Sequence, residues 1–159
     1  ERNTPMGEFT HPKAVTGYEG VGYGGNRGLV HATAIVELPT TALQTSDITW
    51  LMYVPAGAVI VDGYVKADDL DTGTSLAYNI GDSTTTNLFF ANTTTGQSTG
   101  SSAMTTLARY TKCANATRIK MTVATTSETA AAGTLMFGLT YFVDPEINVT
   151  TGVTLTVIS

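Results

Sequence analysis

The sequence predicts an all-β protein: an antiparallel β-sandwich of jelly-roll type, with about eight strands and an extended N-terminal arm. Threonine makes up 31 of the 159 residues, and its branched β-carbon fits the half-buried surface of a strand. Short apolar segments with a period of two recur along the chain between polar turns. No segment has the length and period of a long amphipathic helix, so strands are expected to supply the core.

Residues 1–28 form the predicted arm, because they contain seven glycines and two prolines and lack a sustained apolar period. The arm nevertheless carries aromatic side chains, which a solvated tail does not need. Aromatic anchors on a flexible segment suit binding across a neighbouring surface or wrapping around the chain's own domain, and the sequence leaves both open. The predicted contact residues of the arm are Arg2, Phe9, Tyr18, Tyr23 and Arg27.

The first strand is predicted over residues 29–38, where every second residue is apolar. These apolar residues are Val30, Ala32, Ala34, Val36 and Leu38. Segment 48–54 is almost continuously apolar, which predicts a strand covered on both faces, with Trp50 in the core. After a Pro-Ala-Gly turn, segment 58–67 predicts the next strand, with Gly63 at a β-bulge.

The middle of the chain alternates short apolar segments with polar ones. Segments 75–81 and 87–91 predict two strands joined by a polar turn, and residues 92–102 predict a long polar loop. Segment 103–113 has no clear period, and we interpret it as irregular structure passing into a strand. Such short spacings are typical of a sandwich and not of strands that alternate with helices.

Three further strands complete the predicted sandwich domain, which spans residues 29–159. Segment 118–126 alternates apolar with polar residues, and so does segment 133–143. One face of segment 133–143 carries four large apolar residues, Leu135, Phe137, Leu139 and Tyr141. Segment 153–159 is the last predicted strand. It lies in a C-terminal extension, residues 144–159, that pairs with its own sheet or with a neighbour's edge.

Groups that move protons or attack carbonyls are scarce in this chain. It has two histidines and one cysteine, which are too few and too scattered for a zinc site. It lacks the G-x-S-x-G turn of a serine hydrolase, and His31 falls on the polar face of its strand, which predicts a surface residue. We therefore predict that the protein is not an enzyme and uses no cofactor and no small-molecule substrate.

Asp68, Asp69 and Asp71 cluster in the segment ADDLDTG. Carboxylates at alternate positions of a turn suit calcium. The calcium loop of an EF-hand needs a further oxygen ligand where Gly73 stands, and it needs a closing glutamate that this segment lacks. We therefore favour a solvated acidic turn and predict no bound metal.

The net charge is −5, and nucleic acid is not a predicted partner because too few cations are present to displace its counterions. No apolar stretch approaches the roughly 18 residues of a membrane span, so no membrane is predicted as a partner either. The single Cys113 forms no disulfide within the chain. Because the N-terminus has no apolar signal core, we expect the chain to fold in the cytoplasm.

The charges are unevenly distributed along the chain. No acidic residue lies between Ser83 and Ser127, whereas several cations lie in that span and a group of aspartates precedes it. Patches of opposite sign allow head-to-tail contacts that close into rings, and on this ground we predict a cyclic homotrimer. The alternative is that these charges only keep the surface soluble. The residues predicted for contacts between subunits are Asp68, Asp69, Asp71, Arg109 and Lys112.

Three motifs resemble those of small structural proteins of tailed bacteriophages. A P-A-G-A turn opens an apolar strand at residues 55–61, and a strand and turn ending in Gly-Asp follow at 75–82. A glycine-led strand ends in tyrosine at 132–141, so the resemblance covers roughly residues 50–143. It implies a capsid decoration (cement) protein or another head-associated protein, typically a β-sandwich displayed in many copies.

On this basis we predict a virion structural protein that binds the assembled capsid surface and stabilises it. Its implied partners are the major capsid protein and copies of itself. It is expected at the capsid surface of the virion after synthesis in the host cytoplasm. The alternative is a carbohydrate- or receptor-binding sandwich of a fibre or tail, which predicts an exposed aromatic patch.

Overall fold

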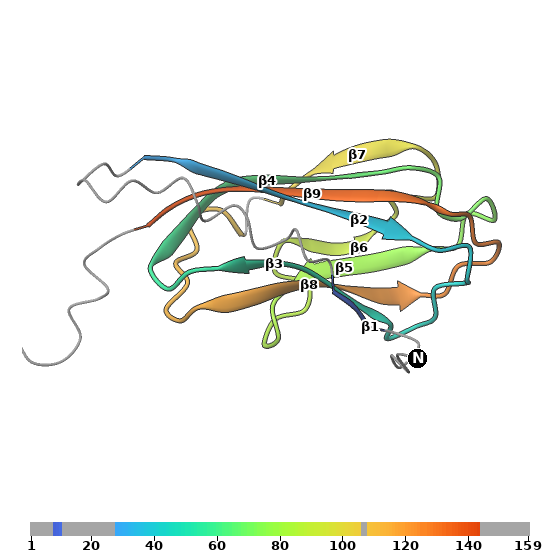
Figure 1. Ribbon diagram of the computed structural model, residues 1–159, viewed down its shortest axis with the longest axis horizontal. Coiled ribbons are helices and arrows are strands. Elements are labelled where there is room, and N and C mark those ends of the chain that lie inside the picture. The colour runs from blue at the N-terminus through green and yellow to red at the C-terminus, as the bar shows by residue number, and fades with distance from the viewer. Residues whose placement is uncertain (1–7, 11–27, 106–107, 144–159) are drawn as a thin grey trace, which may run out of the picture.

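The computed structural model describes residues 8–10, 28–105 and 108–143, and nine strands within these ranges form two sheets. The two sheets stack face to face (Figure 1). Sheet A contains, in spatial order, β1 (Glu8–Thr10), β3 (Ile48–Val54), β8 (Thr117–Thr125), β5 (Ala77–Gly81) and β6 (Phe90–Thr93). Sheet B contains, in spatial order, β2 (Val30–Leu38), β9 (Gly133–Val143), β4 (Ala58–Ala67) and β7 (Gly100–Ala103).

The strands pair in a nested order. β2 pairs with β9, β3 with β8, β4 with β7, and β5 with β6, all antiparallel. This order arises when one long antiparallel hairpin folds over on itself, and the pairs β4–β9 and β5–β8 then join its parts into two sheets. The predicted all-β antiparallel sandwich is confirmed. Its jelly-roll type stays a prediction that the nested order favours.

The core lies between the sheets and is built from every second residue of the long strands. The alternation predicted for the first strand, for 118–126 and for 133–143 is confirmed, because the residues on the predicted apolar faces are buried or nearly so. Phe137 of β9 packs against Phe89 and Phe90 of the facing sheet, with ring centroids 6.0 and 6.3 Å apart. Burying such a ring stabilises the fold by about 1.5–3 kcal/mol.

The predicted segment boundaries are wrong in the region with the fewest apolar residues. β7 (Gly100–Ala103) begins inside the predicted polar loop, residues 92–102, and ends one residue after it. It pairs with the end of β4 although it carries no large side chain. Segment 103–113 forms no regular strand among its described residues. A single bridge joins its Lys112 to Val59 of β4. Residues 144–159, with the predicted last strand, lie outside the described residues.

Two features of the predicted arm and of β4 also differ from expectation. Residues 8–10 of the arm form β1, which runs parallel to β3 and pairs with residues 48–50. The register shift in β4 falls between Ile60 and Asp62, so the bulge lies before Gly63 and not at it. A β-carbon at Gly63 would lie 3.1 Å from the carbonyl oxygen of Gly138, so glycine at this position permits the close approach of β4 and β9.

The same packing makes Gly138 a testable position. Because the ring of Tyr64 lies directly over Gly138, a β-carbon there would overlap the ring. We expect Gly138→Ala to lower the free energy of unfolding by about 1–3 kcal/mol, measured by urea denaturation. We expect a smaller loss when the same substitution is made in a Tyr64→Ala background. Gly100→Ala is the control, because the nearest atom to its β-carbon is 3.8 Å away. Equal losses in both backgrounds would rule out the Tyr64 contact as the cause.

Candidate interaction surfaces

The carboxylate of Asp71 joins two of the segments that cross between the sheets at one end of the sandwich. Residues 68–76 lead from β4 in sheet B to β5 in sheet A, and residues 126–132 lead from β8 back to β9. Asp71 Oδ2 accepts hydrogen bonds from the backbone N–H groups of Ser75 (2.8 Å) and Leu76 (2.7 Å). Asp71 Oδ1 accepts them from Gly73 (3.1 Å) and, across the gap, from Thr129 (2.8 Å).

Asp71 therefore does not belong to a solvated acidic turn or to an exposed charge patch, and both of these expectations are wrong for this residue. Its side chain is fully buried. Burial alone would raise the pKa of the Asp71 carboxyl, but hydrogen bonds from Thr129, Leu76, Ser75 and Gly73 outweigh burial and hold the pKa well below its ordinary value. Because four backbone N–H groups and the Ser75 hydroxyl (3.2 Å) donate hydrogen bonds to the carboxylate, it acts as a structural acceptor.

The other residues of the predicted charge patches have different environments. Asp68 is exposed and Asp69 is partly exposed, so an acidic surface remains at this end of the sandwich. Arg109, at the other end of β4, forms an ion pair with Asp62 of the same chain at 3.0 Å. The structure therefore brings Arg109 and Lys112 close to β4 but leaves Arg109 partly neutralised.

No group of three or more His, Cys, Asp or Glu side chains gathers as a metal site within the described ranges. Burial raises the pKa of the half-buried Cys113 thiol, and the nearby charge of Asp82 raises it further, so the thiolate is disfavoured at neutral pH. The described part of the chain also contains no helix long and apolar enough to cross a membrane.

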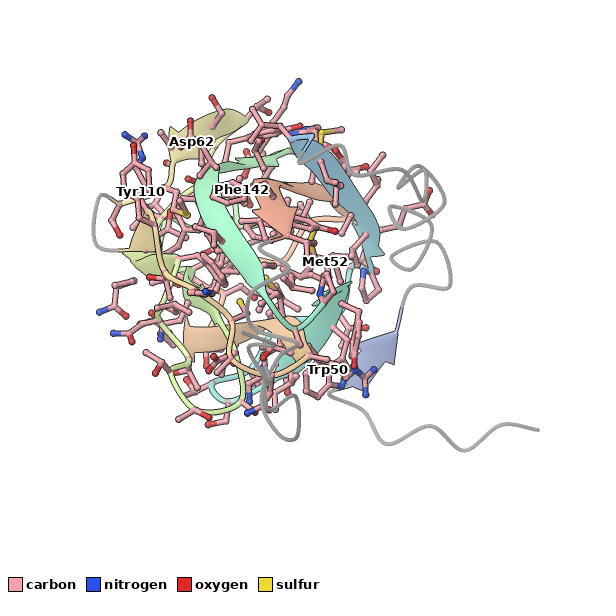
Figure 2. All side chains as sticks on the ribbon, turned by 90° about the vertical axis from the view of Figure 1, so that its left-hand side faces the viewer. Trp50, Met52, Asp62, Tyr110 and Phe142 are labelled. Atoms are coloured by element: carbon pink, nitrogen blue, oxygen red, sulfur yellow. The ribbon has the colours of Figure 1, made fainter. Side chains whose placement is uncertain are left out.

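A basic–aromatic surface lies on the outer face of sheet A. It consists of Trp50 and Tyr53 of β3 and Arg118 and Lys120 of β8. The guanidinium carbon of Arg118 lies 4.2 Å from the centroid of the Trp50 ring, and the Lys120 ammonium lies 5.7 Å from it. Both distances are within the range of cation–π attraction. Figure 2 shows Trp50 on the outside of the sandwich, on the side opposite Asp62.

A β-bulge in β3 builds this surface. Trp50 pairs with Lys120 and Met52 with Ile119, so Leu51 is the extra residue in β3. Leu51 and Met52 both point into the core, and Tyr53, opposite Arg118, points outward again. The prediction of Trp50 as a core residue is therefore wrong, and so is the prediction that this strand is covered on both faces. Tyr53 is 50% exposed, and the sequence carries no signal for the extra residue.

An aromatic pair lies on the outer face of sheet B. The rings of His31 and Tyr64 are almost parallel, with centroids 5.9 Å apart. His31 is exposed, as predicted, and its ring nitrogens hydrogen-bond the hydroxyl groups of Thr140 (2.9 Å) and Thr33 (3.3 Å). The Tyr64 hydroxyl donates to Met136 Sδ at 3.6 Å. The two rings therefore form a flat, partly polar patch on the sheet.

Most of the predicted arm contacts fall outside the described residues. Phe9 is the middle residue of β1, where its backbone pairs with Thr49. Arg2, Tyr18, Tyr23 and Arg27 lie outside the described ranges. The arm contacts therefore remain predictions.

Chains of solved phage capsids share this fold. A chain of the capsid asymmetric unit of cyanophage Pam1 has a TM-score of 0.69 at 24% identity, and the match covers 77% of this chain and 90% of that chain. A chain of the capsid of Ralstonia phage GP4 has a TM-score of 0.63 at 24% identity, covering 74% and 85%. A chain of the acid-stable capsid of Helicobacter pylori bacteriophage KHP30 has a TM-score of 0.51 at 14% identity, covering 73% and 92%. No protein-family model and no curated protein matches the chain. At these identities, the likeness establishes the fold.

The role of Asp71 predicts a large effect of a small change. An amide at this position has one acceptor oxygen, and either orientation places its NH2 group against two backbone N–H donors. We expect Asp71→Asn to lower the free energy of unfolding by at least about 3 kcal/mol at neutral pH. Asp68→Asn is the control, because Asp68 is exposed and accepts one backbone hydrogen bond, from Thr134; about 1 kcal/mol or less is expected.

The same site predicts a dependence on pH. Because the pKa of Asp71 is lowered in the folded chain, its carboxylate stabilises the fold fully above the ordinary value of 3.8, and this contribution is lost as the pH falls through the folded-state pKa. Urea denaturation between neutral pH and about pH 3 should therefore show a steeper loss of stability for the wild-type chain than for Asp71→Asn. Parallel curves for the two proteins would contradict this role of Asp71.

Proposed function

We propose that the chain is a non-enzymatic structural protein of a phage virion that binds the assembled capsid surface and stabilises it. The observation that carries this proposal is the fold shared with chains from three phage capsids, each match covering about three quarters of this chain. The basic–aromatic surface supports it, because Trp, Tyr and Arg are enriched at protein–protein contacts. The scarcity of catalytic side chains in the sequence points the same way.

The proposed mechanism is stabilisation by mass action. A protein that binds the assembled lattice, but not free capsid subunits, lowers the free energy of the lattice relative to its parts. The arm, residues 1–28, is the proposed anchor, with Arg2, Phe9, Tyr18, Tyr23 and Arg27 as contacts. Ordering such a segment costs about 1–2 kcal/mol per residue, so the arm gains affinity only if many contacts form together, as they do on an assembled shell.

The proposed partners are the major capsid protein and further copies of this chain, and the proposed location is the capsid surface. Synthesis is expected in the host cytoplasm. No nucleic acid, membrane or small-molecule substrate enters the proposal.

A second candidate function is binding of carbohydrate or another receptor. The flat patch formed by His31 and Tyr64 favours it, because an aromatic ring beside hydroxyl groups suits stacking and hydrogen bonding to a sugar ring. A sandwich acting in this way would bind its ligand without the arm. The proposed anchor for capsid binding is the arm, so deletion of residues 1–28 is expected to separate the two functions.

Co-sedimentation with capsids that lack this protein tests the leading proposal. We expect the full chain to bind saturably and to raise the temperature at which the capsids disrupt, because bound protein stabilises the lattice. We expect deletion of residues 1–28 to abolish binding while circular dichroism shows that the two sheets persist without the edge strand β1. Free capsid subunits are the control and are expected not to bind.

Three other outcomes would change the proposal in different ways. If neither the full chain nor the truncated chain sediments with capsids, the capsid-binding function is wrong. Binding of glycans by both chains, lost in a His31→Ala variant, would then establish the second candidate. Binding of capsids by both chains would retain the function and move the anchor from the arm to the sandwich.

A further inference from the structure

We propose that the basic–aromatic surface binds the acidic end of a second copy of this chain, so that copies associate head to tail. The acidic end consists of Asp68, Asp69 and Glu128, on the two crossing segments that Asp71 joins, residues 68–76 and 126–132. This inference rests on the proposed function, in which copies of this chain are partners; it names the two surfaces by which they meet and is testable without a capsid.

The basic–aromatic surface carries two positive charges, those of Arg118 and Lys120. Arg118 and Lys120 lie at alternate positions of β8, so they point to the same face about 7 Å apart. Neither forms an ion pair with a carboxylate of the described residues. Both cations lie over the same Trp50 ring. Like charges held this close repel each other, and a carboxylate from outside the chain would relieve that repulsion.

The side chains around these cations are those of a protein contact. Arginine, tryptophan and tyrosine dominate the binding energy of protein interfaces because they bury a large area and keep a polar group for pairing. Tyr53, opposite Arg118 in the ladder, leaves half of its surface exposed. A partner that covers Tyr53 would also shield the Arg118 charge from water and strengthen its attraction to a carboxylate.

The acidic end offers carboxylates with free capacity to accept hydrogen bonds. Asp68 and Glu128 are exposed, and Asp68 uses only Oδ2 within the chain, for the N–H of Thr134. Asp69 is only partly exposed and its Oδ1 is buried, so Asp68 and Glu128 are the carboxylates most open to a partner. Asp71 holds the two segments together by its bonds to residues 73–76 and 129, so these carboxylates are presented on a fixed scaffold.

The two surfaces lie too far apart to neutralise each other within one chain. Arg118 is near the start of β8, whereas β8 ends at Thr125 and Glu128 follows. The seven residue-to-residue steps of extended strand from 118 to 125 span about 23 Å. β8 runs along the length of the sandwich in Figure 1, toward the end where the crossing segments lie. Contact between the basic–aromatic surface of one copy and the acidic end of the next pairs the charges of both surfaces. Repeated contacts of this kind close into a ring when the rotation that relates neighbouring copies permits it.

An acidic protein surface fits these cations better than a nucleic acid does. Two cations on one face suffice for a pair of carboxylates. A nucleic acid requires a continuous basic track, and the net charge of −5 repels such a polyanion.

Charge reversal tests the contact on the full chain. The cation variant is Arg118→Glu with Lys120→Glu, and the acid variant is Asp68→Lys with Glu128→Lys. At low salt, sedimentation velocity should show that the wild-type chain self-associates and that each variant alone associates at least about tenfold more weakly. An equimolar mixture of the two variants should regain association, because each then offers the charge that the other lacks. Thr33→Glu is the control, because Thr33 is exposed in the middle of β2 on sheet B and belongs to neither surface, and it should behave as wild type.

Thermal unfolding of each variant establishes that the fold persists. A wild-type chain that stays monomeric at low salt, or variants that associate as tightly as wild type, would overturn the proposal. If the wild-type chain is monomeric and only the cation variant loses capsid binding, the basic–aromatic surface contacts the shell and not a second copy. Binding of single-stranded DNA that the cation variant loses would assign the surface to nucleic acid.

Discussion

The sandwich depends on how the chain crosses between its two sheets. Two of the crossings at one end, residues 68–76 and 126–132, converge on the buried carboxylate of Asp71, which accepts hydrogen bonds from the N–H groups of Gly73, Ser75, Leu76 and Thr129. An extended chain that leaves one sheet for another loses its ladder hydrogen bonds, and buried N–H groups without acceptors cost about 1–3 kcal/mol each. One carboxylate satisfies four of them and ties these two crossings together. The rings of Phe89, Phe90 and Phe137 pack against one another between the two sheets.

In this sandwich, the residues that stabilise the fold are different from those available to bind other molecules. The residues that hold it together point inward or accept backbone hydrogen bonds, so the outer faces are free to carry charge and aromatic rings. On sheet A, the bulge at Leu51 brings Trp50 and Tyr53 to one side beside two cations of β8. At the opposite end, the crossing segments present carboxylates. Separate basic and acidic surfaces on one molecule suit binding to protein neighbours better than binding to a small ligand.

Sequence patterns predict the parts of this fold that repeat. The alternation in β2, β8 and β9 is strong because each strand contributes one face to a single core, and a shift by one residue would expose that face. β7 carries no such signal, since its Gly-Ser-Ser-Ala segment pairs by backbone alone. Trp50 was predicted inside because an apolar run does not reveal a bulge. The prediction of a solvated Asp71 is wrong because the residues next to it in sequence do not reveal whether an aspartate is buried. The Thr129 N–H group, which donates to Asp71, is brought near it only by the fold.

The proposed role as a capsid-surface protein is tested most directly by an electron cryomicroscopy map of capsids saturated with the full chain. We expect the sandwich on the outer surface of the shell, with the part of residues 1–28 outside β1 ordered along capsid subunits that the sandwich itself does not cover. Such a map would show that this part of the arm contacts the lattice while β1 stays paired with β3. Density that shows the arm outside β1 wrapped around its own sandwich, or no density for the chain on the shell, would contradict the proposed role.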